Sequence, residues 1–372
     1  MTPRERLLRT MRGERADRVP LVLPAFQRRL RADVEAIEEP LRRQVAERAW
    51  ERMHYSVGVG APINRYLVTP PQRMHGERED LPNGRRRHNG VIDTPKGELT
   101  FITEWNAESP QTSWTIKYPC ETLEDIAKIA SVPWERAPSL QPPKLDELPA
   151  DFAERGIVRT GVSSPFVCVA GMMRYERFLE LVAMELPLIE ELTAICLERI
   201  LDCLEVLFSE PGIEYVWMGG SEWVTPPMAS PRIYDRLVQE QERAIIEYVH
   251  GHSDAVVHVH CHGNIRDALP KTIARGGDYT EPCEPPPDGD ITMAEAKAVS
   301  AGQITLGGNV EARVLCNEDE ATVERAVRAA FEGGKERLVL RPSEGASPHL
   351  SEREFRNYMR LIDVWEELSP MG

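Results

Sequence analysis

Short apolar segments alternate with helical patterns along this chain, and this alternation constrains the fold more than any other feature. The apolar segments begin near residues 19, 55, 157, 214, 255, 278, 303 and 337. Strands that alternate with helices at this spacing predict parallel βαβ units. Eight such units in 372 residues predict an α/β fold, a closed (β/α)8 (TIM) barrel.

Residues 64–118 interrupt the alternation with a different sequence pattern. Asn83-Gly84 and the Thr94–Gly97 segment are turn signals between short polar strands. We therefore expect a small antiparallel insertion at about residues 64–118, and one barrel domain over residues 1–372 that carries it. Within the insertion, the run from Arg85 to His88 is expected to be a solvated loop rather than a substrate clamp.

The segment from Ala255 to Gly263 combines a β-branched run with three histidines at alternate positions. In a strand, side chains two residues apart share a face, so His258, His260 and His262 point the same way. A core strand with satisfied histidines is the plainer interpretation. Three imidazoles in register are hard to bury, however, because each ring nitrogen needs a partner. This pattern favours a metal or catalytic site.

Polar residues follow the predicted strands at the end where (β/α)8 barrels form their active sites. Glu222 and Glu281 follow the fourth and sixth strands, and we expect them to act as acid or base. Asn309 and Arg159 are expected to line the pocket and to contact a cofactor. Carboxylates and imidazoles from several strands therefore converge on one mouth.

Zinc is the metal that this set of side chains favours, because it takes imidazole, thiolate and carboxylate ligands and keeps one position open in catalytic sites. His260 and His262 supply two ligands from one strand. The third ligand comes from elsewhere, and Cys261 ranks last because it faces the other side of the strand. The candidates are Glu344, Glu222, Cys283 and Cys261.

Composition excludes several classes of function. A net charge of −15 and a pI of about 5.2 argue against binding to nucleic acid or to anionic membrane surfaces. The sequence has no apolar run of transmembrane length and no signal-peptide core. Seven scattered cysteines without a CxxC pair are typical of a reduced, cytoplasmic chain.

The motifs resemble those of the uroporphyrinogen decarboxylase superfamily, and within it the corrinoid-dependent methyltransferase branch. The resemblance covers nearly the whole chain and implies a (β/α)8 barrel. The segments that carry it include Thr2–Arg6, Asp17–Pro20, Thr94–Gly97, His260–Gly263 and Gly307–Glu311.

The resemblance also implies a ligand set. The methyltransferase branch binds zinc through a His-x-Cys motif on strand five and a cysteine after strand eight. On this chain His260, His262 and Glu344 stand at those positions. The arginine-rich signature of true uroporphyrinogen decarboxylases is absent from Leu23–Arg28, so porphyrinogen decarboxylation is not expected.

The function implied by these residues is zinc-dependent methyl transfer between a small substrate and cobalamin, a corrinoid cofactor carried on a partner protein. A homodimer is compatible with this expectation. One alternative is a decarboxylase or lyase that acts on a small carboxylate without cobalamin. A second alternative is a catalytically silent barrel that serves as a partner subunit.

Overall fold

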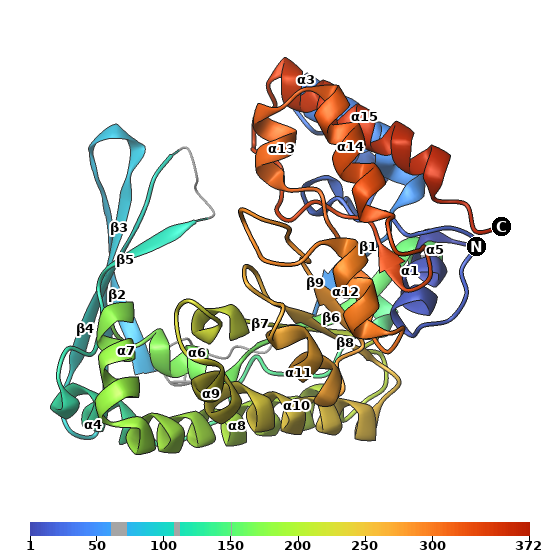
Figure 1. Cartoon of the computed structure of the whole chain (residues 1–372). Coiled ribbons are helices and arrows are strands. Elements are labelled where there is room, and N and C mark those ends of the chain that lie inside the picture. Colours follow the sequence, from blue (N-terminus) through green and yellow to red (C-terminus); the bar gives the residue numbers. More distant parts are fainter. Residues whose placement is uncertain (61–72, 108–111, 150) are drawn as a thin grey trace.

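The computed structural model describes residues 1–60, 73–107, 112–149 and 151–372 (Figure 1). Its centre is a curled, parallel seven-stranded sheet in the order β1-β6-β7-β8-β9-β10-β11. The α/β class and the position of each of these strands were predicted correctly from the apolar segments. The strands are β1 Tyr55–Gly58, β6 Gly156–Ser163, β7 Tyr215–Gly219, β8 Val256–His260, β9 Tyr279–Glu281, β10 Thr305–Gly307 and β11 Leu338–Val339.

The predicted first strand, near residue 19, is reduced to an isolated parallel bridge between Leu21 and Leu340. Two hydrogen bonds support the bridge, from Val22 N–H to Leu340 O and from Leu340 N–H to Pro20 O, each at 2.9 Å. Proline has no N–H, so Pro20 cannot donate to a longer ladder. The sheet is therefore a barrel-like curl of seven strands joined to an eighth segment. Among the described residues, the strand pairing does not complete the closed ring that the sequence predicted.

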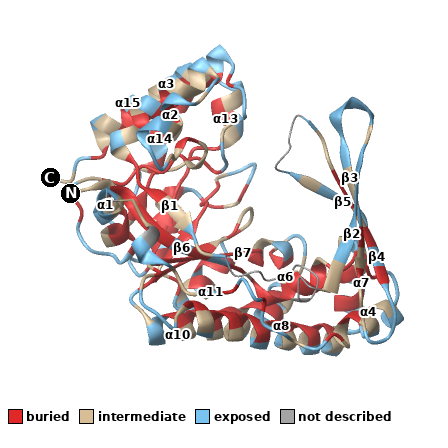
Figure 2. Cartoon of the chain, turned by 180° about the vertical axis from the view of Figure 1, so that it is seen from behind, coloured by how far each residue is buried: buried red, intermediate tan, exposed pale blue. Residues whose placement is uncertain are grey.

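Helices cover the outer face of this sheet (Figure 2). The α-helices of the described residues are α1 Pro3–Met11, α2 Arg31–Glu35, α3 Pro40–Ala49, α4 Leu123–Ala130, α5 Phe152–Arg155, α6 Pro165–Ala170, α7 Tyr175–Met184, α8 Leu186–Leu207, α9 Pro231–Tyr234, α10 Glu240–His252, α11 Ala268–Ala274, α12 Met293–Ser300, α13 Ala312–Asn317, α14 Glu320–Ala330 and α15 Glu352–Leu368. None of those described has the length and apolar surface that crossing a bilayer requires.

The two faces of the sheet pack against different partners, because successive side chains of a strand alternate between faces. Val158 of β6 and Val216 of β7 lie in an outer cluster with apolar residues of α8 and α10. Ile157 and Tyr215 face the lumen of the curled sheet instead. Leu7, Leu8 and Met11 of α1 join that inner cluster, so α1 covers the N-terminal ends of the strands.

The predicted antiparallel insertion is present as a second sheet of four strands in the order β2-β3-β4-β5. Its strands are β2 Met74–Asp80, β3 Arg86–Ile92, β4 Leu99–Trp105 and β5 Ser113–Lys117. The expected start of the insertion at residue 64 lies outside the described residues. The Arg85–His88 run, expected in a loop, lies mostly in β3, where Arg87 pairs with Glu104 at 2.6 Å. Assignment of residues 1–372 to one domain stays a prediction.

Candidate active site

Strand register arranges the lumen side chains in levels. Residues paired between neighbouring parallel strands point to the same face, so the levels can be read from the pairing of β7 with β8 and of β8 with β9. The inner level comprises Trp217, His258 and Tyr279, and the outer level comprises Gly219, His260 and Glu281. The outer level stands at the C-terminal ends of the three strands.

The carboxylate of Glu281 lies at the centre of the polar contacts in the lumen. Its Oε1 atom lies 2.8 Å from His258 Nε2, 2.7 Å from His260 Nδ1 and 2.8 Å from Arg341 Nη1. The side chain is fully buried, and its Oε2 atom has no hydrogen-bond partner. Burial opposes ionisation, but Arg341 and His258 outweigh it and hold the pKa of Glu281 well below its usual range. The site therefore contains a buried carboxylate with one oxygen free.

His258 is held as a neutral imidazole. Burial lowers its pKa to about 4, although Glu281 opposes this shift. The Nδ1 atom is hydrogen-bonded to the hydroxyl of Tyr215. Burial raises the pKa of that hydroxyl, so Tyr215 keeps its proton. The Nε2 atom then faces Glu281 at 2.8 Å without the alignment of a regular hydrogen bond.

His260 and His262 lie progressively closer to the surface than the buried carboxylate of Glu281. The His260 ring lies 5.3 Å from the Trp217 ring and 4.6 Å from the His262 ring, centroid to centroid. His262 Nδ1 lies 3.2 Å from both carboxylate oxygens of Glu284. Burial lowers the pKa of His262, but Glu284 outweighs it and the pKa is raised overall. Of the three imidazoles, His262 has the most accessible side chain, at 32% exposure.

A groove of about 990 Å³ opens beside His262. Burial raises the pKa of Glu222, one of its lining residues, although His260 and His262 oppose the shift. Glu222 is anchored by the Gly220 N–H at 3.1 Å from its Oε2 atom. Glu344 is exposed. The groove therefore brings together residues from segments that follow several strands, namely Glu222, His262, Glu284, Asp288, Cys316 and Glu344.

Among the described residues, one set of three potential metal ligands has its ligand atoms all within 4.8 Å of one another: His258, His260 and Glu281. The predicted set combined His260 with His262 and Glu344, whereas the geometry groups His260 with Glu281. Two imidazoles and a carboxylate are a donor set that zinc accepts. The free, buried Oε2 atom of Glu281 is consistent with a cation there, while Arg341 competes for the same carboxylate. The residues present therefore fit a metal.

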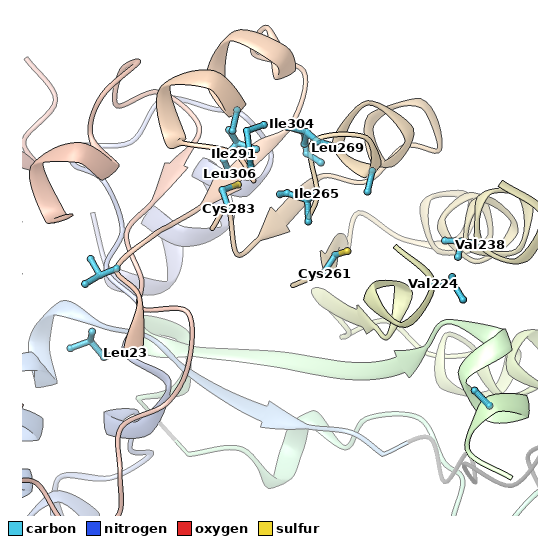
Figure 3. Packing of buried hydrophobic residues seen from close by; sticks show 14 of the residues in the cluster. Leu23, Val224, Val238, Cys261, Ile265, Leu269, Cys283, Ile291, Ile304 and Leu306 are labelled. Carbon is cyan, nitrogen blue, oxygen red and sulfur yellow. The ribbon is translucent and has the colours of Figure 1, made fainter. Parts of the chain in front are cut away.

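The two cysteines considered as third ligands lie in the hydrophobic core. Figure 3 shows Cys261 near Ile265, and Cys283 near Ile291 and Leu306. Burial raises the pKa of each thiol to about 12, so both stay protonated at neutral pH. Neither belongs to the cluster of His258, His260 and Glu281.

Asn309 and Arg159 lie on different strands of the barrel-like sheet. Asn309 follows β10, is 7% exposed, and has no hydrogen-bond partner for either amide atom. Arg159 lies on β6 with an exposed side chain. The sequence did not assign roles to Tyr215, Glu284 and Arg341, which the structure places in direct contact with the histidines or with Glu281. The alternation that puts Val339 on the lumen face also puts Arg341 there, which was the available signal.

Comparison with known proteins gives a family and a fold. The sequence profile of the family described as uroporphyrinogen decarboxylase (URO-D) matches residues 117–365. A methyltransferase from Methanosarcina mazei shares the fold with a TM-score of 0.58 and 15% identity, over 99% of each chain. A B12-independent methionine synthase from Shewanella sp. W3-18-1 gives a TM-score of 0.40 and 10% identity, over 80% of this chain and 76% of that one. No curated protein matches the sequence.

Proposed function

The chain belongs to the uroporphyrinogen decarboxylase family, and from this premise we propose that it is a zinc-dependent methyltransferase. The methyl group passes between a small substrate and cobalamin carried on a separate protein. The observation that carries the proposal is the cluster of His258, His260 and Glu281 at the C-terminal end of the lumen, beside the groove that His262 lines.

The metal would be held by His258, His260 and Glu281, with His262 and Glu344 as the outer candidates at the mouth. Bound zinc supplies Lewis acidity toward an oxygen, nitrogen or sulfur atom of the substrate. Imidazole and carboxylate ligands leave more positive charge on the ion than thiolates do, which favours an oxygen or nitrogen atom over sulfur.

The protein side chains have roles that are independent of the metal. Glu281 orients His260 through a contact of 2.7 Å, and Arg341 holds Glu281 in place at 2.8 Å. Trp217 packs against the His260 ring and shields it from water. Glu222, whose pKa is raised by burial, holds a proton more readily than an exposed carboxylate and can deliver it to a leaving group.

The test combines metal analysis with a spectroscopic assay on the whole protein. We expect about one zinc per chain by elemental analysis. With an added alcohol or amine as acceptor, we expect metal-dependent transfer of the methyl group from methylcobalamin to the acceptor oxygen or nitrogen, followed by the absorbance change of the corrinoid. Glu281→Gln should lose both, whereas Glu295→Gln, a capping residue of α12, should keep both. A metal-free protein that folds normally and shows no cobalamin chemistry would contradict the proposal.

A second candidate function is decarboxylation or lyase chemistry on a small carboxylate, without cobalamin. The exposed guanidinium of Arg159 on the lumen face favours it, because arginine pairs well with carboxylates. Release of carbon dioxide from a carboxylate substrate in the absence of any corrinoid would favour this candidate over methyl transfer. A protein that binds metal and turns over substrate by either route excludes a catalytically silent subunit.

A further inference from the structure

Arg159 projects from the lumen face of the barrel-like sheet. It lies on β6 two residues after Ile157, which belongs to the inner cluster. In the strand register it pairs with Gly58 of β1 and with Tyr215 of β7. Its side chain is exposed.

The guanidinium of Arg159 has no hydrogen-bond or ion-pair partner among the residues that the structure describes. Two other arginines with little exposed side-chain surface have carboxylate partners. Arg341 pairs with Glu281 at 2.8 Å, and Arg275 pairs with Glu242 at 2.7 Å. An unpaired cation on the lumen face of a chain with a net charge of −15 is an exception that a ligand would account for.

The surroundings of Arg159 include His54 and two further arginines. His54 is buried nearby and is bonded to Gln27, with 3.0 Å between their side-chain nitrogens. Burial, with the added effect of Arg159, Arg155 and Arg341, lowers the pKa of His54 to about 3. His54 is therefore neutral, and of these guanidinium groups Arg341 is already paired with Glu281.

Space for such an anion is left by glycines. A Cβ atom added at Gly58, the β1 partner of Arg159, would meet no atom of the described residues within 4 Å. A Cβ atom at Gly161, two residues further along the same face, would come no closer than 3.7 Å to Trp217. The region between Arg159 and the level of His258 and His260 is thus bordered by small residues and one aromatic ring.

We propose that Arg159 binds a carboxylate group of the substrate, so that the substrate is a small carboxylic acid with its reactive end directed toward His260. The inference rests on the proposed function, since that function places the substrate in the lumen. It adds the substrate class, and it makes Arg159 a contact of the substrate rather than of the cofactor.

The test measures binding of small acids to the full chain by ligand-observed NMR. The probes are glycolate, succinate and benzoate, each compared with its neutral amide of the same shape. We expect at least one acid to bind in preference to its amide. Arg159→Gln should lower the affinity for that acid by about tenfold, the loss of one charge-assisted pair, and should leave the affinity for the amides unchanged. Arg159→Lys should recover part of the affinity.

Arg78→Gln is the matched control, since Arg78 is an exposed strand arginine on the separate antiparallel sheet. It should bind the acid as the unaltered protein does. Equal binding of acids and amides, no binding of any acid, or unchanged acid binding by Arg159→Gln would each overturn the inference. The Arg159→Gln variant should retain its zinc. If that variant loses its preference for acids while it keeps its metal, the result leaves both the metal site and methyl transfer standing. Absence of zinc with intact acid selectivity refutes the proposed function alone.

Discussion

The Nδ1 atom of His260 lies 2.7 Å from Oε1 of Glu281, and the same oxygen lies 2.8 Å from a guanidinium nitrogen of Arg341. One buried carboxylate oxygen thus serves an imidazole at the end of β8 and an arginine that follows β11. This shared contact ties together strands that are far apart in the sequence, and it makes Glu281 the residue whose replacement is most informative.

Replacement of Glu281 by Gln should destabilise the protein by about 3–5 kcal/mol, because it leaves the buried charge of Arg341 without its partner. The double variant Glu281→Gln/Arg341→Met removes that unpaired charge and should recover much of the loss. Urea unfolding of both single variants and the double variant measures the coupling. Strictly additive effects would show that the two side chains do not depend on each other.

The histidines should separate into buried and accessible classes. His258→Ala removes the partner of Tyr215 and should cost about 1–3 kcal/mol of stability. His262→Ala and Glu344→Ala, at the mouth, should change the stability of the metal-free protein by less than about 1 kcal/mol while lowering bound zinc. The measurements are melting temperature without metal and zinc per chain. Full zinc retention with a lowered melting temperature would assign His262 a structural role.

Asn309 should be dispensable for stability. Neither of its amide atoms has a protein partner, so Asn309→Ala loses no hydrogen bond and should change the free energy of unfolding by less than about 1 kcal/mol. We expect instead a raised KM for the substrate. Asn357 is the control, since it is fully buried and its amide donates to Leu315 O and Glu318 O at 2.9 Å. Asn357→Ala should therefore cost about 1–3 kcal/mol, and equal losses for the two variants would argue that Asn309 is structural.

Gly307 should be intolerant of any side chain. A Cβ atom there would clash with the hydroxyl of Tyr279 and with Cβ of Glu281, so Gly307→Ala should displace Glu281 and abolish metal binding. Gly251→Ala is the comparison, because a Cβ atom in that part of α10 meets nothing within 4 Å. That variant should be stabilised by about 0.5–1 kcal/mol. Retained zinc in Gly307→Ala would show that the lumen can expand around the new methyl group.

The pair of His250 and Asp278 should make a pH-dependent contribution to stability. Their side chains lie 2.8 Å apart, and the hydrogen bond to Asp278 raises the pKa of His250 above its usual 6.5. The contribution is therefore complete below about pH 6.5 and is lost as the pH rises through the folded-state pKa. Because His250 is partly exposed, we expect less than about 1 kcal/mol.

Urea unfolding of His250→Gln and of the unaltered protein, at about pH 6 and about pH 9, checks this sign. The difference between them should shrink at the higher pH. His252→Gln is the control for a change of histidine at the same end of α10, since His252 contacts the Tyr248 carbonyl. A difference that grows with pH would contradict the assignment.

Strand positions were predictable from the sequence because they depend on local patterns. The alternation in Ala255–Gly263 was enough to put His258, His260 and His262 on one face. The shortened first strand illustrates the limit of that approach. The residues around Pro20 have the composition of a buried strand. Pro20 itself lacks an N–H, which shortens the hydrogen-bond ladder that the pattern predicts.

The site was less predictable, because it depends on register between strands. Register decides that Glu281 pairs with His260, and nothing within either strand specifies that match. Resemblance directed attention to Glu344, whereas Glu281 has the shorter distances to the imidazoles. Arg341 was visible as a residue after the last strand, but its role follows only from the carboxylate that it meets.

The packing of Leu7, Leu8 and Met11 under the lumen cluster has a kinetic consequence. With α1 across the N-terminal ends of the strands, traffic between the lumen and solvent passes through the opposite end. A small substrate lodged beside Arg159 would then have to arrive before a bulky carrier covered that entrance. The spent molecule could leave only after the carrier had departed, so binding would be strictly ordered and high carrier concentrations would slow turnover.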